Sequence, residues 1–423
     1  MTLKRVSRNK VRVLEGALID RYLCKRQLHV LLNTILSVLG FWLQTFKVWG
    51  LYRKQRFIII RYVKNLSILW ELPRPKTLSY WWGFGSLLGI LIAIQVASGL
   101  ILAFCYSSGV LAWSSVIEIT REVYAGWLIR SIHRNTASFV FFIIFMHFFR
   151  GIIQGSFYLV LPWIRGFILM LLTIAAAFLG YVLPWGQISF WGATVIINLL
   201  RILPYGKILV VWLWGGFYVS AATCRFFFAL HYIVPFAVLA TILVHLFFLH
   251  FSGSSSFGGI NHSDRLKVKF GLLFSFKDMV NVIFIWVGFL VILSMPDLFS
   301  DPVNFLPADL SSSPVHIQPE WYFLHFYAVL RAIPNKVGGL IIFFLAIFVI
   351  LFFSWIRSEL SLSHFLYYDL LAWSFVFSNF LLIWLGSQPV EDPFIWLRQL
   401  LTLLYFSFFF LLKSLDFFAF FFF

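Results

Sequence analysis

Hydrophobic positions fall into long unbroken runs along this chain. Windows of about 20 apolar residues, the length that a helix needs to cross a bilayer, occur at roughly 82–104, 124–149, 166–184, 227–249, 279–296, 339–356, 369–386 and 399–413. The chain is 61% hydrophobic and 12% charged, whereas soluble domains carry about 25% charged residues. The pattern predicts an all-α polytopic membrane protein with eight transmembrane helices: a four-helix bundle over 66–260 and a C-terminal four-helix region over 261–423.

Residues 1–65 form a basic N-terminal extension, with 14 lysines and arginines against Glu15 and Asp20. Within it, residues 29–46 are apolar enough for a ninth span, but polar interruptions and basic flanks favour an interfacial helix. No cleavable signal peptide is visible. Threading eight spans places the N-terminus, three basic loops (150–165, 250–278, 357–368) and the C-terminus on one side. The positive-inside rule makes this side the matrix or cytoplasm.

Two pairs of histidines lie inside the second and fourth spans. His133 and His147 are 14 residues apart, and so are His231 and His245. Fourteen helical steps return to nearly the same face after a rise of ~21 Å, so each helix carries one histidine near each edge of the bilayer core. The two helices run in the same direction, which pairs His133 with His231 near the outer surface and His147 with His245 near the inner surface. Imidazoles in lipid need partners, and the pattern therefore predicts two bis-histidine metal centres.

Glycines repeat this spacing on the other two helices of the bundle. Gly85 and Gly99 lie in the first span, and Gly166 and Gly180 lie in the third. Because glycine lets backbones approach closely, four glycines at the histidine spacing fit two flat macrocycles pressed against the helices. Ordinary small-residue helix packing is the alternative explanation.

Two arginines flank the histidines. Arg130 precedes His133 by three residues and Arg150 follows His147 by three, so each lies beside its histidine and is displaced towards water. A guanidinium there can pair a haem propionate, or it can simply anchor the helix at the interface. The chain's three cysteines form no C-x-x-C-H motif, which excludes covalent c-type haem attachment by that signature.

The chain resembles the cytochrome b subunit of respiratory complex III, the quinol–cytochrome c oxidoreductase. The resemblance covers roughly residues 62–415 and rests on long motifs: WWGFGSLLGI from Trp81, GYVLPWGQISFWGATVI from Gly180, PEWYFLHFYAVLRAIPNKVGG from Pro319 and GSQPVEDPF from Gly386. It implies two non-covalent b haems, held by His133/His231 and His147/His245. Equal spacing in both helices, with all eight spans in one chain, is typical of the mitochondrial type, since the plastid counterpart is split. Residues 1–50 match nothing in the family.

The resemblance implies two quinone sites. The outer, quinol-oxidising site would comprise Phe178, Tyr181, Gly192, Ile196, Pro319, Glu320, Tyr322, Phe323 and Tyr327. Glu320 is expected to take up the quinol proton there, because a carboxyl beside an apolar pocket favours its neutral form; outside PEWY, Pro-Glu would only mark a helix start. The inner, quinone-reducing site would comprise His250, Ser254, Lys277 and Asp278. A histidine beside a Lys–Asp pair can bind quinone carbonyls and supply protons.

The implied activity is that of a ubiquinol–cytochrome c reductase in the mitochondrial inner membrane, with its N-terminus in the matrix. It would oxidise ubiquinol at the outer site, reduce ubiquinone at the inner site and couple the two to proton translocation in a Q cycle. The expected partners are a Rieske-type iron–sulfur protein, a membrane-anchored c-type cytochrome subunit, other complex III subunits and a second copy of the complex. No nucleic acid partner is expected.

Three positions depart from the family pattern. Arg225 lies six residues before His231, where the family has an arginine five before, and Phe226 takes that place. Gly83 replaces a polar residue of the W-W-x-F-G-S motif, which predicts the loss of one contact near the inner haem. His325, just after PEWY, is interpreted as a packing or solvent-facing residue.

Two other classes of protein carry intramembrane histidines. A two-haem transmembrane reductase of another family needs only four to six spans and no PEWY loop. A secondary transporter commonly shows internal repeats, and none is visible in this chain. A reduced-minus-oxidised spectrum separates the transporter from the other two, because a transporter lacks b-type bands.

Overall fold

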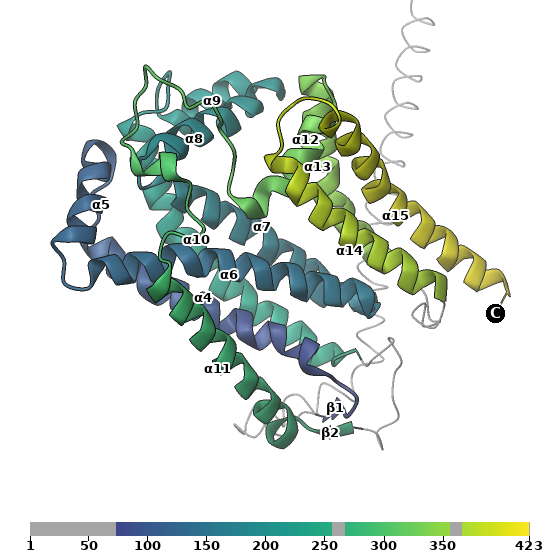
Figure 1. Ribbon diagram of the computed structural model, residues 1–423. Helices are drawn as coiled ribbons and strands as arrows, with labels where there is room; N and C mark the ends of the chain where they lie inside the picture. Colours follow the sequence, from purple (N-terminus) through teal and green to yellow (C-terminus); the bar gives the residue numbers. More distant parts are fainter. Residues whose placement is uncertain (1–72, 256–266, 356–365, 423) are drawn as a thin grey trace, which may run out of the picture. The chain divides into compact units, whose positions relative to one another are not determined.

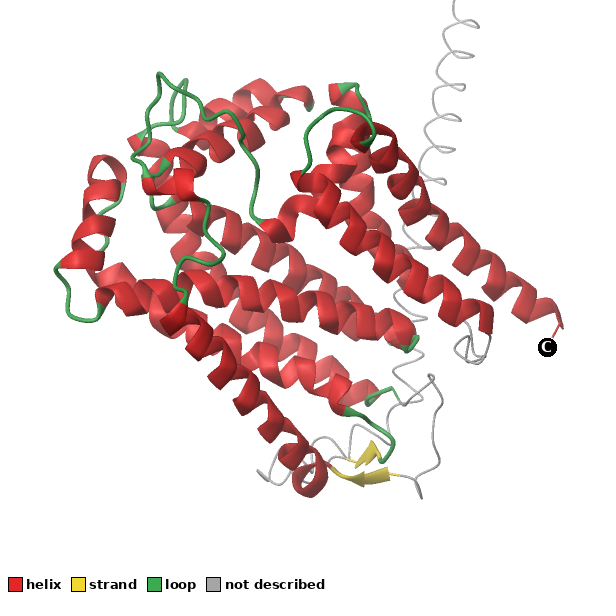
Figure 2. Cartoon of the chain, viewed as in Figure 1, coloured by secondary structure: helices red, strands yellow, loops and turns green. Residues whose placement is uncertain are grey.

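The computed structural model describes residues 73–255, 267–355 and 366–422, which all belong to one compact unit, Leu72–Phe423. The N-terminal extension, with its apolar segment 29–46, lies outside the described residues. The described part of the chain is almost entirely helical (Figures 1 and 2). The all-α fold expected from the apolar runs is confirmed.

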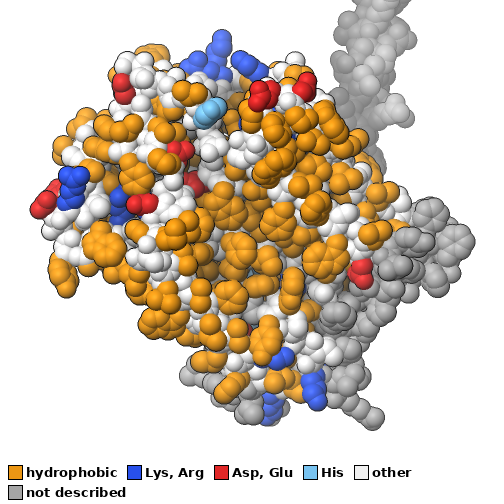
Figure 3. Space-filling model, viewed as in Figure 1, with side chains coloured by type: hydrophobic (Ala, Val, Ile, Leu, Met, Phe, Trp, Pro, Cys, Tyr) orange, Lys and Arg blue, Asp and Glu red, His pale blue; other side chains and the backbone are white. Residues whose placement is uncertain are grey.

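Eight helices in the described residues are long and apolar enough to cross a membrane. They span Tyr80–Cys105, Gly126–Ile153, Val160–Val182, Ala221–Ser252, Leu273–Ser294, Lys336–Ser354, Tyr368–Ser387 and Phe394–Leu415. Apolar side chains cover the middle of the face seen in Figure 3, and most charged side chains gather towards its two ends. The eight predicted spans are therefore confirmed. Several helices extend beyond the predicted windows because the helical backbone continues through polar residues at the membrane edge.

Four helices form the N-terminal bundle: α4 (Phe84–Cys105), α6 (Gly126–Ile153), α7 (Val160–Val182) and α10 (Ala221–Ser252). Helix α4 packs along α6, and α7 packs along α10. Helix α10 begins six residues before the predicted window because a capping box starts it: the Ser220 and Thr223 side chains satisfy backbone N–H groups of the first turn. This early start leaves His231 well inside the helix.

The C-terminal region consists of α11 (Phe270–Ser294), α12 (Leu324–Ala332), α13 (Lys336–Phe348), α14 (Leu366–Ser387) and α15 (Phe394–Phe422). Helix α11 packs against α4 and α6, whereas α12 contacts α13, α14 and α15. Aromatic side chains dominate the core between these last helices, with Phe353, Phe375, Phe408 and Phe409 all buried. Their rings stack or meet edge to face at centroid distances between 4.3 and 5.8 Å.

Short elements connect the spans at both ends. Helices α5 (Ala112–Arg121), α8 (Gln187–Leu199) and α9 (Gly206–Trp214) lie in the loops, as do the 3-10 helices Pro302–Phe305 and Trp321–Phe323. Helix α8 follows directly after the third span, α7. The long loop after α11 is tied to α8, because the Ser189 N–H donates to the Asn304 side chain (2.9 Å) and Gln187 donates to the Ser312 carbonyl (3.1 Å). Those contacts position the segment that leads into Glu320.

A two-stranded antiparallel ribbon lies at the opposite end, between β1 (Pro73–Pro75) and β2 (Lys267–Lys269), with Arg74 opposite Val268. It joins the chain segment before α4 to the start of α11. The sequence pattern did not predict these short strands. The ribbon brings Arg74 beside the end of α10, near the expected inner site.

Candidate functional site

His133 on α6 faces His231 on α10. Their ring centroids are 6.2 Å apart and their planes are inclined by 84°. The His231 Nδ1–H donates to the Ala176 carbonyl at 2.8 Å. The Ser98 hydroxyl donates to the Ile94 carbonyl at 2.7 Å, so it accepts a hydrogen bond from His133 Nδ1, 3.0 Å away. With both Nδ1 atoms protonated, both Nε2 atoms carry free lone pairs, which is the state of a metal ligand.

Each of the four predicted glycines lies against one histidine. A methyl group on Gly99 would meet His133 Cε1 at 2.9 Å, and one on Gly180 would meet His231 Cε1 at 2.5 Å. On the other level, a methyl group on Gly85 would lie 3.6 Å from His147 Cε1, and one on Gly166 would lie 3.6 Å from His245 Cε1. The glycines of α4 thus face the histidines of α6, and those of α7 face the histidines of α10.

The second histidine pair lies one level further along the same helices. His147 and His245 are close enough to interact electrostatically, and the positive charge of Arg150 also interacts with both imidazoles. The His147 Nδ1 atom is buried and has no hydrogen-bond partner among the described residues. The Arg150 guanidinium lies over the Trp82 ring, 5.2 Å from its centroid, a cation–π contact that holds it beside this pair.

A cavity of about 300 Å³ joins the first histidine pair to the PEWY segment. Its lining includes His133 and His231 together with Tyr181, Glu320 and Tyr322. Gly99, Gly180, Arg130 and Arg134 also line it. Most of the lining is apolar, so the few polar groups would fix the orientation of an apolar ligand.

Glu320 is the titratable carboxyl of this cavity. Burial raises its pKa to about 7, although a hydrogen bond from Tyr181 and the charge of Arg134 favour the ionised form. Burial also raises the pKa of the Tyr322 hydroxyl well above its usual range, which keeps it protonated. The Tyr322 ring stacks on Phe141 with a centroid distance of 4.1 Å. A carboxyl with a pKa near 7 can both accept and release a proton at physiological pH.

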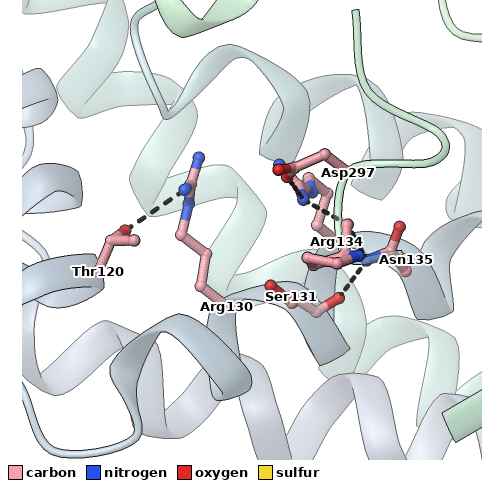
Figure 4. A network of polar contacts seen from close by, with 7 residues as sticks. Thr120, Arg130, Ser131, Arg134, Asn135 and Asp297 are labelled. Atoms are coloured by element: carbon pink, nitrogen blue, oxygen red, sulfur yellow. Dashed lines mark hydrogen bonds and ion pairs between the residues drawn. The ribbon is translucent and has the colours of Figure 1, made fainter. Parts of the chain in front are cut away.

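Two arginines follow one another along α6 at the edge of the cavity (Figure 4). Arg130 donates to the Thr120 hydroxyl at 3.3 Å. Arg134 pairs with Asp297 at 2.5 Å and donates to the Pro296 carbonyl at 2.6 Å. The sequence analysis singled out Arg130 but not Arg134. The position of Arg134 directly after His133 could have indicated that it lies near the histidine pair. Arg134 ties α6 to the loop after α11.

Not all residues expected at the outer site line this cavity. The structure brings Tyr181, Glu320 and Tyr322 together. The Phe323 ring packs against Phe141 and Tyr322, with centroid distances of 5.7 and 4.6 Å. The Tyr327 ring instead lies under the Arg331 guanidinium at 4.9 Å. Those expected residues that do not line the cavity are Phe178, Gly192, Ile196, Pro319, Phe323 and Tyr327.

The expected inner-site residues come from two helices. His250 lies in the last turn of α10, and Ser254 lies two residues after the end of that helix. Arg74 donates to the Ser254 hydroxyl, and its charge interacts with His250. Lys277, in the second turn of α11, donates to the Leu78 carbonyl at 2.6 Å. Its neighbour Asp278 accepts a hydrogen bond from Ser86 on α4. Arg74 and Ser86 are additions that the sequence alone did not single out.

The structure shows the surroundings of Arg225 and His325, two of the positions that depart from the family pattern. Arg225 is exposed and its side chain packs over Gly109, where a methyl group would lie 2.8 Å from Arg225 Nε. The φ of +90° at Gly109 also favours glycine at this position. His325 is buried between Phe326 and Tyr405, with ring centroids 4.8 and 5.1 Å away. Burial lowers its pKa to about 3, so this histidine is neutral. Its predicted packing role agrees with this position.

Two family models match the chain. The model described as Cytochrome b/b6/petB matches residues 69–253, and the model described as Cytochrome b(C-terminal)/b6/petD matches residues 307–406. The chain belongs to the cytochrome b family. A solved structure titled "Hyperthermophilic respiratory Complex III" contains a similar chain, with a TM-score of 0.78 and 29% identity, and the match covers 88% of this chain and 98% of that one. This cytochrome b is a multi-pass membrane protein with an oxidoreductase role in electron transport, and its family binds haem b.

The pair of His133 and His231 fits haem. Histidine nitrogens lie ~2.0–2.1 Å from a metal, so two imidazoles that share one metal have ring centroids roughly 6 Å apart, which agrees with the 6.2 Å between His133 and His231. Both rings have Nδ1 engaged and Nε2 free. Gly99 and Gly180 leave space beside the two histidines, and a methyl group on either glycine would fill it. This space suits the flat face of a macrocycle.

Proposed function

We propose that this cytochrome b is the core electron-transfer subunit of a quinol–cytochrome c oxidoreductase, with two b haems and two quinone sites. One observation carries the proposal: a single apolar cavity holds a histidine pair suited to haem and a carboxyl whose pKa lies near 7. With haem held by the histidine pair, this arrangement would place an electron acceptor and a proton acceptor beside a quinol bound in the cavity.

His133 and His231 would hold the outer haem, and His147 and His245 the inner one. Bound haem supplies a one-electron acceptor at each level, and the two together carry electrons between the faces of the membrane. Arg130 and Arg150, three residues from their histidines, would pair the acidic groups of the two haems. Gly85, Gly99, Gly166 and Gly180 would make room for the macrocycles.

The protein's part in quinol oxidation is to bind the quinol and take its proton. Glu320, held by the Tyr181 hydroxyl, would accept the proton of a quinol hydroxyl when its carboxyl is ionised. The stacked pair of Tyr322 and Phe141 would present an apolar wall to the quinol ring. The resemblance also implies Phe178, Gly192, Ile196, Pro319, Phe323 and Tyr327 at this site, although none of the six lines the cavity.

At the inner site, His250 and Asp278 would supply protons to the bound quinone, with Ser254 and Lys277 as hydrogen-bond partners. Ubiquinone is the expected substrate. The proposal places the chain in the mitochondrial inner membrane with its N-terminus in the matrix. Its partners would be a Rieske-type iron–sulfur protein, a membrane-anchored c-type cytochrome and a second copy of the complex. The neighbour titled respiratory Complex III supports this assembly.

Haem reduction by quinol in the purified complex tests the proposal. Quinol should reduce two b-type centres, and inhibitors of the outer and inner sites should each block one route of electron entry while both together block reduction. A complex with only one b-type centre, or one whose reduction by quinol persists with both sites blocked, would contradict the proposed function.

A further inference from the structure

The loop after α11 supplies part of the lining of the cavity beside His133. We call residues 296–305 the loop wall, because its members that line the cavity are Phe299, Ser300, Asp301, Asn304 and Phe305. The far end of the loop wall is tied to α8, since the Ser189 N–H donates to the Asn304 side chain. The near end, where the chain leaves α11 at Ser294, is held by a different set of contacts.

Two neighbouring residues of α6 hold the near end of the loop wall (Figure 4). Arg134 donates to the Pro296 carbonyl at 2.6 Å and pairs with Asp297 at 2.5 Å. Asn135 donates to the same carbonyl at 2.8 Å. The Arg134 guanidinium also lies 5.8 Å from the centroid of the Phe305 ring, a cation–π contact. Arg134 therefore contacts both ends of the loop wall.

These contacts fix the loop wall relative to the outer histidine pair. Arg134 directly follows His133 in the sequence, so both side chains start from adjacent positions on the same helix. A loop wall that moves away from Arg134 therefore also moves relative to His133. At the inner level the residue after His147 is Phe148, whose ring packs against Trp163 at 5.6 Å. An arginine in this position thus distinguishes the outer level from the inner one.

We propose that Arg134 is a positioning residue of the outer quinone site, which holds the loop wall in place beside His133. The inference rests on the proposed function, because it assigns the cavity to a quinol. The bond to the Pro296 carbonyl and the contact with Phe305 carry most of the effect. The ion pair adds less, since the Asp297 side chain is 61% exposed and exposed ion pairs contribute little.

The test follows the reduction of cytochrome c by decylubiquinol in the purified complex, and counts only the rate that an outer-site inhibitor abolishes. Arg134→Met keeps an apolar stem and removes the guanidinium. It should raise the KM for decylubiquinol roughly tenfold, the scale of one hydrogen bond from a charged group. The kcat should stay within about threefold of the parent, because a displaced wall weakens quinol binding while Glu320 and the histidine pair remain.

Rescue by lysine separates this role from a merely structural one. A single nitrogen of Arg134 makes both bonds to the loop, so a lysine ammonium can replace it. Arg134→Lys should therefore bring the KM back to within about threefold of the parent. Arg121→Met is the matched control, since Arg121 is exposed at the end of α5 and its loss should leave both KM and kcat unchanged.

Asp297→Ala probes the same contact from the loop and leaves α6 unaltered. It should raise the KM roughly two- to threefold in the parent. In the Arg134→Met background it should have no effect, because the partner of Asp297 is already gone. Reduction of haem through the inner site, measured with the outer site blocked, should keep the parental rate in every variant.

Four results would overturn the inference: an unchanged KM in Arg134→Met, no rescue in Arg134→Lys, additive effects of Arg134→Met and Asp297→Ala, or a parallel loss at the inner site. Loss of the outer haem in both Arg134 variants would also overturn it, because the residue would then serve the histidine pair. If only Arg134→Met loses that haem, Asp297→Ala decides: a raised KM supports the inference and an unchanged KM overturns it. A parent complex in which quinol reduces no b-type centre would instead overturn the proposed function.

Discussion

Gly180 lies so close to His231 that a methyl group at position 180 would come within 2.5 Å of the imidazole Cε1 atom. The equivalent distance between Gly166 and His245 is 3.6 Å, which is ordinary van der Waals contact. The two levels of the bundle therefore differ in how tightly the backbone of α7 holds the histidine of α10. The outer histidine cannot keep its place if position 180 carries a side chain.

Gly180→Ala should therefore lose most of the outer haem, because the His231 ring must turn away from His133. Gly166→Ala is the matched control on the same helix, and it should keep its inner haem to a much greater degree. Reduced-minus-oxidised spectra of the purified complexes, normalised to protein, measure both. Equal haem loss in the two variants would contradict the distinction between the levels.

His147→Ala should remove the inner haem and leave part of the outer haem spectrum, because His147 shares its level with His245 and not with His231. His133→Ala should do the reverse. The two spectra can be told apart by their response to an outer-site inhibitor, which should perturb the centre that remains in His147→Ala. If the remaining centre failed to respond, the pairing of the histidines would be wrong.

Glu320→Gln should slow quinol oxidation by roughly a hundredfold, the scale of one positioned general base, with both haems still bound. The amide keeps the shape and the hydrogen-bonding capacity of the side chain but cannot take a proton. Turnover with quinol and haem content should be measured in the same preparation. Normal turnover in this variant across pH 6–9 would show that Glu320 is not the proton acceptor and only marks the start of a helix.

Quinol oxidation should also depend on pH through Glu320. Burial raises the pKa of this carboxyl to about 7, and only the ionised form accepts a proton. The outer-site rate should therefore fall about tenfold per pH unit below 7 and level off above it. Glu320→Gln should lose this inflection, which distinguishes the effect of Glu320 from that of another titrating group in the complex.

Residues 1–50 should lie on the matrix side and should not be needed for haem binding. Their basic excess is difficult to move across an energised membrane, and no histidine, glycine or quinone-site position proposed above falls within them. Protease treatment of vesicles of both orientations tests the placement. Cleavage between Arg8 and Arg12 only from the outer side, or loss of both b-type bands from an assembled deletion variant, would contradict this prediction.

The sequence by itself determined the features that depend on one helix at a time. Apolar runs of sufficient length predict eight spans, because the bilayer sets the length of a helix that crosses it. The 14-residue intervals from His133 to His147 and from Gly166 to Gly180 set the levels of the sites, because the helix repeat is a local property. The PEWY motif, part of the family resemblance, is likewise read from one short continuous stretch of sequence.

Only the tertiary structure decided which residues meet across helices. That the Asn281 side chain on α11 donates to the Gly83 carbonyl, or that Arg134 reaches Asp297, depends on how far each helix is rotated and shifted against its neighbour. The shared cavity of Glu320 and His133 likewise requires the loop after α11 to be tied to α8. These contacts join residues more than 150 positions apart. Periodicity along one helix carries no information on that rotation and shift, because both are set by side-chain packing between helices.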